Sequence, residues 1–356
     1  MKDRINTGRQ LELDVAKVFA ILYMVTIHVY EEMSVVNYYW ARPDNAFRFI
    51  LEFLGGPLAA PVFMFAMGVG MVYTKRRTPR AFALRGLKLL AASYLLNVVR
   101  MTIPYFLALL SGDSWGNWTV VDTIGLVDIL QFAGMAFLLM ALLEKWKAGR
   151  WVILAVALLL QGLGLILLHS FDGLPSAAQY ALGLFFHTNY NVCFPLTLWF
   201  VYPAFGLCFG EYLQTVSDKG TMYNRIAVLS AAGVLAFSAG MKHLGWNPVD
   251  NFALARDVYY IQHLPGTLWT LAVIGLQLFV CYRISLLLSK PLATGAEFIS
   301  RRLNTIYLIQ WLIIPYTVIL LEAAGVPRLP VWAIIPAGLL ITAVSVFVSK
   351  YIRFKL

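Results

Sequence analysis

Charged residues are scarce in this chain. They make up 13% of its 356 residues, whereas soluble domains carry about 25%. Apolar residues reach 60%, and the mean hydropathy is +0.73. A soluble fold of this length cannot bury so much apolar surface, so a large part of the surface must face lipid. The low charge content therefore excludes a soluble globular protein and predicts an integral membrane protein.

Cysteine is also scarce. The three cysteines, Cys193, Cys208 and Cys281, lie in apolar runs without CxxC spacing or a paired histidine. This pattern is typical of small buried apolar side chains. It argues against a disulfide framework and against a metal site, so no metal is expected.

Ten apolar stretches are predicted to be membrane-spanning helices, and the one at 127–143 is at the short limit for crossing about 30 Å of hydrocarbon. They cover residues 13–30, 50–74, 82–103, 127–143, 151–169, 191–213, 226–244, 264–288, 303–322 and 330–349. The first stretch lacks a cleavage site of small residues, so we expect a retained helix. The predicted fold is all-α, polytopic, and a single domain over residues 1–356.

The positive charge follows the predicted topology. With a cytoplasmic N-terminus, 20 of the 28 Lys and Arg residues fall in cytoplasmic segments, and five fall outside. The five are Arg42, Arg48, Lys242, Arg256 and Arg328. This asymmetry predicts that both termini are cytoplasmic, in what we expect to be a bacterial plasma membrane. It also explains the net charge of +10 without a nucleic-acid partner.

Three ionisable residues lie in the first span, where each is costly and suggests a function. Lys17 and His28 are eleven residues apart, so they share one helix face about 16 Å apart along the axis. Asp14 lies three residues before Lys17 and is expected to pair with it. Snorkelling by Lys17 and helix-to-helix hydrogen bonding by His28 are the alternatives.

His28 is a candidate general base, because imidazole titrates near neutral pH. A carboxylate would orient the ring, and the sequence does not rank the choices. They are Glu31, Glu32, Glu52, Asp122 and Asp128.

A basic run opens the third span. It contains Arg76, Arg77 and Arg80, and continues into the helix with Arg85 and Lys88. Such an entrance suits a phosphate-rich ligand such as coenzyme A, although ordinary positive-inside patterning also produces it. Arg100 lies further on, and its placement at the outer interface or in the interior depends on where the helix starts.

Other polar residues in the spans are expected to support helix packing; they are Asn97, Gln131, Glu211, Asn304 and Gln310. Gly68, Gly70, Gly206 and Gly210 would permit close helix approach.

The predicted outer segments contain His169, His187, Trp246 and His263. They suit either a wet surface for a polar ligand such as a sugar, or an interfacial aromatic belt.

The order of these motifs resembles two related families. Lys17, ten residues and His28 resemble the Arg-x10-His signature of the membrane-bound acyltransferase-3 family. Residues 56–68 and the basic segment through Arg85 are similar to that family's second helix, and equally to heparan-alpha-glucosaminide N-acetyltransferase-like proteins. Residues 128–131 and 194–206 resemble the second group. The resemblance covers most of residues 11–210, with a weaker segment at Leu303–Trp311.

The resemblance implies transfer of an acyl group, usually acetyl, from cytoplasmic coenzyme A to a hydroxyl or amine across the membrane. His28 would be the catalytic histidine, Lys17 a donor-side charge, and Arg85 a coenzyme A-side charge. Lys17 replaces an arginine and so loses bidentate phosphate geometry. The heparan-type histidine follows the first helix, but residues 31–49 contain none, which favours the acyltransferase-3 assignment of His28.

We therefore expect an acyltransferase that uses acetyl-CoA or another acyl-CoA and modifies an extracytoplasmic glycan or lipid-linked acceptor. The expected catalytic residues are His28, Lys17 and Asp14. The expected donor-binding residues are Arg85, Lys88, Arg76, Arg77 and Arg80. His28 would act as a general base or as a covalent acyl carrier. Membrane lipids are expected partners, and self-association is left open. The alternatives are a transporter or flippase that uses Asp14, Lys17 and His28 as a relay, and a non-catalytic relative.

Overall fold

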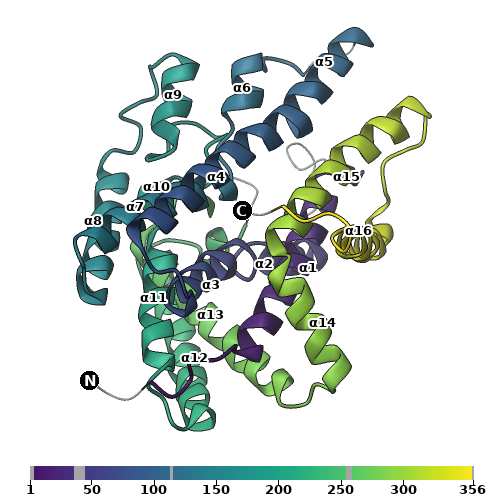
Figure 1. Cartoon of the computed structure of the whole chain (residues 1–356). Coiled ribbons are helices and arrows are strands. Elements are labelled where there is room, and N and C mark those ends of the chain that lie inside the picture. The colour runs from purple at the N-terminus through teal and green to yellow at the C-terminus, as the bar shows by residue number, and fades with distance from the viewer. Residues whose placement is uncertain (1–3, 36–44, 113–114, 254–258, 355–356) are drawn as a thin grey trace.

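The computed structural model describes residues 4–35, 45–112, 115–253 and 259–354, and Figure 1 shows that they form an all-helical molecule. The longer helices are α1 (Leu11–Met33), α3 (Ala60–Tyr73), α4 (Pro79–Asn97), α7 (Ile129–Lys145), α8 (Arg150–Ile166), α11 (Val201–Leu213), α12 (Lys219–His243), α13 (Leu264–Ser285), α14 (Lys290–Arg301), α15 (Leu303–Ala323) and α16 (Ile334–Val348). The shorter ones are α2 (Ala46–Gly55), α5 (Ile103–Leu110), α6 (Val120–Gly125), α9 (Ser176–Gly183) and α10 (Leu196–Trp199). A π-helical turn, Val98–Thr102, joins α4 to α5.

Eight helical stretches among the described residues are long and apolar enough to cross a membrane, so the predicted polytopic all-α fold is confirmed. Several combine consecutive short helices. The eight are α1, Ala46–Tyr73, Pro79–Leu110, Leu196–Leu213, α12, α13, α15 and Val331–Val348. The other two predicted spans correspond to α7 and α8, which have 17 residues each. That length gives about 26 Å, a few ångströms less than the hydrocarbon core.

Large apolar side chains cover the outside of the molecule. Leu229 and Leu235 on α12 are each 72% exposed, and Ile166 on α8 is 79% exposed. Water would strongly disfavour so much exposed apolar surface, whereas lipid tails accept it. The three cysteines among the described residues are free; Cys281 is fully buried, as predicted for small apolar side chains, whereas Cys193 and Cys208 are only half-buried.

Two glycines bring α3 and α11 into close contact. A side chain at Gly68 would overlap the Pro203 carbonyl, and one at Gly206 would overlap the Phe65 carbonyl. Each glycine therefore allows its helix to rest on the backbone of the other. The predicted role of Gly68 and Gly206 in close helix approach is confirmed.

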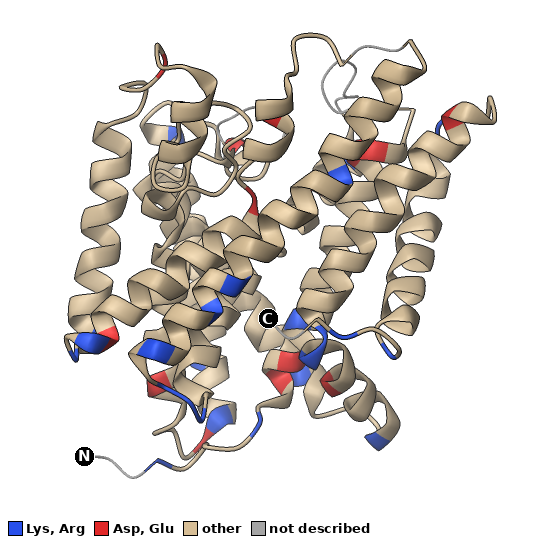
Figure 2. Ribbon diagram, turned by 45° about the horizontal axis from the view of Figure 1, so that its top comes forward, with Lys and Arg blue, Asp and Glu red and all other residues tan. Residues whose placement is uncertain are grey.

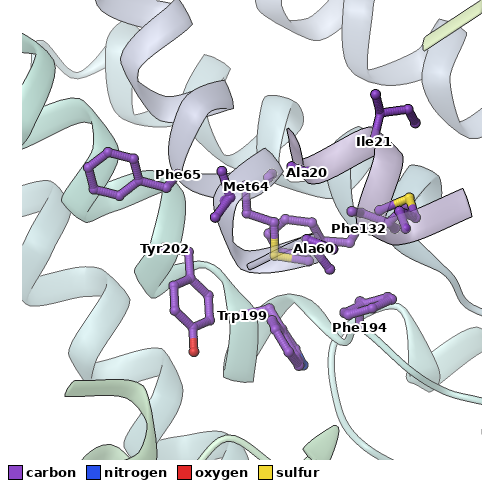
Figure 3. Close-up of a cluster of buried hydrophobic side chains, with 14 of the residues drawn as sticks. Ala20, Ile21, Ala60, Met64, Phe65, Phe132, Phe194, Trp199 and Tyr202 are labelled. Carbon is purple, nitrogen blue, oxygen red and sulfur yellow. The ribbon is translucent and has the colours of Figure 1, made fainter. Parts of the chain in front are cut away.

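A cluster of buried apolar side chains lies where α1, α3, α7, α10 and α11 meet (Figure 3). Ala20 and Ile21 of α1, Met64 of α3, and Phe132 of α7 are at most 1% exposed. Trp199, at the end of α10, is completely buried. This packing fixes α1 in the middle of the molecule, with its polar residues facing other helices.

Most Lys and Arg residues occupy ribbon positions toward one end of the helices (Figure 2). Both described chain ends lie against segments at that end: the Asn6 amide donates to the Val216 carbonyl, and the Phe354 N–H donates to the Thr305 hydroxyl. Four basic residues of the topology prediction lie outside the described residues; they are Lys2, Arg42, Arg256 and Lys355. We call this end the basic end.

Candidate active site

A cavity of about 660 Å³ opens among α1, α3, α4, α7, the α14–α15 junction and the C-terminal segment. Its described lining includes basic residues from five separate segments and no Asp or Glu. The basic residues are Lys17, Arg76, Arg85, Lys88, Arg301, Arg302 and Arg353. Arg301 is paired with Glu297 outside the wall, and the other six cations have no carboxylate on the described wall. The cavity is therefore positively charged, which suits a ligand that carries several negative charges.

Four of the six basic residues expected on the donor side line this cavity. Lys17, Arg76, Arg85 and Lys88 reach it from α1, from the α3–α4 loop and from α4. The Arg85 guanidinium lies 4.5 Å from the centroid of the Phe137 ring, a cation–π contact that fixes its position on the wall.

The other two basic residues lie elsewhere. The Arg77 Nε donates to the Glu144 carboxylate at 3.0 Å, and Arg77 also lies 3.6 Å from Glu211. Arg77 therefore connects the α3–α4 loop to α7 and α11, and it does not line the described cavity wall. Arg80 is exposed in the first turn of α4 and is also absent from that wall.

Asp14 has a different partner from the expected one. Its two carboxylate oxygens accept hydrogen bonds from Arg9 at 2.6 and 2.9 Å, and the Ser300 hydroxyl donates to it at 2.6 Å. The predicted Asp14–Lys17 pair was wrong, because Arg9 precedes the helix and folds back over its first turn. Asp14 thus joins the start of α1 to α14.

Lys17 makes no hydrogen bond or ion pair with another described residue, although Asp14, Arg9 and Arg85 act on it electrostatically. Its side chain lines the cavity together with Ile21 and Met24, which follow it along α1. The cavity therefore follows α1 to a point one turn before His28. A buried ammonium without a bonded partner leaves donors available for a ligand.

His28 lies beyond the inner end of the cavity, against α15. Its Nδ1 is 3.3 Å from the Gln310 Oε1, and its ring centroid is 4.2 Å from that of Trp311. The residue as a whole is half-buried. Gln310 was predicted to support helix packing; the structure places it at the candidate catalytic residue.

A buried ion pair lies beside His28. Arg100 is 3% exposed, its Nη2 donates to Asp128 at 2.8 Å, and its guanidinium lies 4.4 Å from the Trp311 ring centroid. The interior placement considered for Arg100 is therefore confirmed. The Tyr307 hydroxyl, which lines the cavity, donates to the same Asp128 carboxylate at 3.0 Å. Tyr307, Asp128 and Arg100 thus connect the cavity to the surroundings of His28.

The π-helical turn explains how Arg100 reaches this position. The N–H of Ile103 bonds to the carbonyl of Val98, five residues back, and Pro104 follows without an N–H of its own. The wider turn directs residue 100 into the molecule. Asn97, one turn earlier, donates to the Ile124 and Leu126 carbonyls, which confirms its predicted packing role.

Among the candidate carboxylates, Asp128 pairs with Arg100 beside His28. Arg100 also acts electrostatically on Glu32, and Glu31 is half-buried on α1. Glu52 pairs with Arg48 at 3.1 Å, and Asp122 accepts from Tyr180 at 2.9 Å. Glu32 is exposed on α1. Asp128 acts electrostatically on His28 from the start of α7.

The predicted outer segments contain a separate polar cluster. The Tyr180 hydroxyl donates to Asp122, and the Asn191 amide donates to the same hydroxyl at 2.7 Å. Burial raises the pKa of the Tyr180 hydroxyl, so it stays a donor at neutral pH. The rings of Trp246 and His263 pack 5.5 Å apart. These partners satisfy one another and hold the outer loops together.

The residues that the sequence reasoning missed lie on α15. Tyr307, Gln310 and Trp311 are spaced by three and four residues, so they share one face of the helix. Polar and aromatic residues at that spacing within an apolar span were the available signal. A single sequence does not say which helix this face meets.

Residues 9–244, about two thirds of the chain, match the family described as heparan-alpha-glucosaminide N-acetyltransferase, catalytic. A comparison with curated proteins found no match. The matched range contains α1, α3, α4 and α7, including His28, Lys17, Arg85, Arg100 and Asp128. The match is to the second of the two families that the sequence resembles, so the likeness to the acyltransferase-3 family stays a prediction. The chain belongs to the heparan-alpha-glucosaminide N-acetyltransferase catalytic family, a family of acetyltransferases.

Proposed function

We propose that this membrane protein transfers an acetyl group from acetyl-CoA, bound in the basic cavity, to an acceptor that reaches His28 from the opposite side of the membrane. The observation that carries the proposal is the cavity itself. It has seven basic side chains and no carboxylate on its described wall, and it leads along α1 toward His28. The basic end would face the cytoplasm, where acyl-CoA is found.

Coenzyme A has the charge that this cavity suits. Its phosphates would bind the cations near the mouth, on the α3–α4 loop, the α14–α15 junction and the C-terminal segment. Lys17 lies deeper, with the apolar side chains of Ile21 and Met24 beyond it. A long donor with a charged head and an uncharged arm would therefore enter with its thioester toward His28.

His28 would act as the general base toward the acceptor. As a half-buried residue it is accessible to an acceptor, and its contacts with Gln310 and Trp311 hold the ring in one orientation. Holding the donor thioester, base and acceptor together supplies proximity, which is a large part of acyl-transfer catalysis. The family's name indicates an amine of a glucosaminide as its acceptor; for this chain we propose an amine or hydroxyl of an extracytoplasmic glycan or lipid-linked sugar.

Donor binding is tested by thermal stabilisation of the purified protein in detergent. Millimolar coenzyme A should raise the melting temperature, because a ligand that binds only the folded state stabilises it. Arg85→Ala should lose most of this shift. Arg225→Ala removes an exposed arginine of α12 outside the cavity wall and should keep it.

Absence of any shift in the wild-type protein, or equal shifts in both variants, would contradict the donor site.

A transporter or a non-catalytic relative would leave acetyl-CoA intact even if it bound the coenzyme. Release of free coenzyme A from acetyl-CoA, dependent on an added amino sugar, therefore separates these alternatives from the enzyme.

A further inference from the structure

Besides the Nε1 of Trp311, two buried hydrogen-bond donors beside His28 have no hydrogen-bond partner in the described part of the chain. They are the Nε of Arg100 and the Nε2 of Gln310, on residues that are 3% and 0% exposed. Each residue uses its other polar atoms: Arg100 Nη2 bonds to Asp128 and Asn97, and Gln310 Oε1 contacts His28. An unsatisfied buried donor costs about 1–3 kcal/mol, so two of them at one place indicate a missing acceptor.

Trp311 brings the two donors to the same place. Its ring contacts both the Arg100 guanidinium and the His28 imidazole. Gln310 precedes it on α15 and touches the same imidazole. One donor therefore belongs to a residue that contacts the His28 imidazole directly, and the other belongs to a residue that packs on the same tryptophan ring as His28.

We propose that Arg100 and Gln310 bind the reacting carbonyl oxygen, and that Gln310 also sets the tautomer of His28. This inference rests on the proposed acyl transfer. An amide oxygen only accepts hydrogen bonds, so its contact places the imidazole proton on Nδ1. The Nε2 of His28 is then left with a free lone pair, which is the form that a general base needs.

The transfer step balances with these roles. The acceptor's amine or hydroxyl attacks the thioester carbonyl carbon, and His28 Nε2 takes the proton that this group loses. The carbonyl electron pair moves onto oxygen, where the Arg100 Nε–H and the Gln310 Nε2–H bind the negative charge. When the carbonyl re-forms, the carbon–sulfur bond breaks, and the coenzyme A thiolate takes the proton from His28. Preorganised donors of this kind contribute about 10²–10³-fold each to turnover.

Asp128 makes Arg100 a fixed donor. Its carboxylate pairs with Arg100 Nη2, and it is itself held by Tyr307 and by the N–H of Ile129 at 2.7 Å. Asp128 therefore fixes the orientation of the Arg100 guanidinium, and with it the direction in which the Nε–H points. Asp128 is a positioning residue for this site, since it acts through Arg100.

Kinetics of matched variants test the oxygen site. Gln310→Leu should lower kcat by about 100-fold with the KM for acetyl-CoA changed less than about threefold, because the lost contact forms mainly in the transition state. Gln310→Glu keeps an acceptor for His28 but lacks the donor, so it should lose turnover as well. Arg100→Lys keeps the charge beside Asp128 and should also lose kcat.

Gln277→Leu is the control. Gln277 is a buried glutamine of α13 whose side-chain amide has no partner among the described residues, and it does not line the cavity. It should keep the wild-type kcat. Wild-type turnover in Gln310→Leu, together with active wild-type enzyme, would overturn the inference and leave the proposed function standing. An inactive wild-type protein would instead refute the proposed function.

The tautomer of His28 can be measured directly, and it would not change if Gln310 had only a structural role. Nitrogen-15 NMR of histidine-labelled protein separates protonated from unprotonated ring nitrogens, and His28→Asn identifies the signal among the five histidines. We expect a neutral His28 ring with its proton on Nδ1 in the wild type and in Gln310→Glu, and a mixture in Gln310→Leu. A wild-type proton on Nε2 would overturn the inference, because Gln310 would then donate to His28.

Discussion

Lys17 and Asp14 show how neighbours on one helix can have different roles. Both were expected on the donor side, as a pair. In the structure Lys17 lines the cavity without a bonded partner, and Asp14 accepts hydrogen bonds from Arg9 and Ser300. Sequence spacing correctly predicted that the two residues are close. It did not predict that a residue before the helix would compete for the carboxylate.

Lys17→Met should weaken donor binding. Loss of a charge-assisted hydrogen bond costs about 1.5–3 kcal/mol, so we expect the KM for acetyl-CoA to rise by roughly 10–100-fold. The melting temperature without ligand should not fall, because Lys17 has no bonded partner to lose in the described structure. Lys17→Arg should restore most of the binding. An unchanged KM in Lys17→Met would remove Lys17 from the donor site.

Asp14→Ala should destabilise the fold. It leaves Arg9 and the buried Ser300 hydroxyl without their acceptor, at an expected cost of about 1–3 kcal/mol. The melting temperature of the purified protein should fall. Glu322→Gln, which alters an exposed carboxylate of α15, is the control and should change it much less. Equal melting temperatures would show that Asp14 does not join α1 to α14.

Among the helices, the apolar spans could be predicted from the sequence and the π-helical turn could not. Eight of the ten predicted spans agree with the structure, because about 20 consecutive apolar residues are a strong signal. The turn at Val98–Thr102 has the same apolar composition as the helix around it. Only Pro104 indicated an irregularity, and it did not show that Arg100 would turn inward.

The contact between α3 and α11 depends on two glycines, and alanine substitutions test it. Gly68→Ala should lower the yield of folded protein and its melting temperature, because the added methyl group overlaps the Pro203 backbone and forces the helices apart. Gly70→Ala is the matched control, since nothing lies within 4 Å of its added methyl group. Equal yields and melting temperatures would contradict the close crossing.

For the whole molecule, residue charge predicts an orientation in the membrane, which stays a prediction, but it did not predict the shape of the cavity. The basic residues occur in several segments of the sequence, and the structure gathers seven of them around one volume. Arg301, Arg302 and Arg353 come from beyond residue 300, far from the α3–α4 basic run. Helix order alone does not say that these segments meet. The cavity was therefore visible only in three dimensions.

The orientation in the membrane is tested by cysteine labelling in intact cells. In a background with Cys193, Cys208 and Cys281 changed to serine, Trp246→Cys should react with a membrane-impermeant maleimide. Lys145→Cys, at the basic end, should react only after permeabilisation. Both side chains are exposed, so neither is shielded by the protein. The reverse pattern would contradict a cytoplasmic basic end.

The most direct test of the central claim measures acetyl transfer itself. Purified protein in detergent would be given [¹⁴C]acetyl-CoA with glucosamine as an amine acceptor, and with N-acetylglucosamine, which offers only hydroxyl groups. The wild type and His243→Ala, which alters an exposed histidine at the end of α12, should form labelled product at equal rates. His28→Ala, present at the same folded level, should form product at less than about 1% of that rate. Wild-type transfer by His28→Ala would contradict the account.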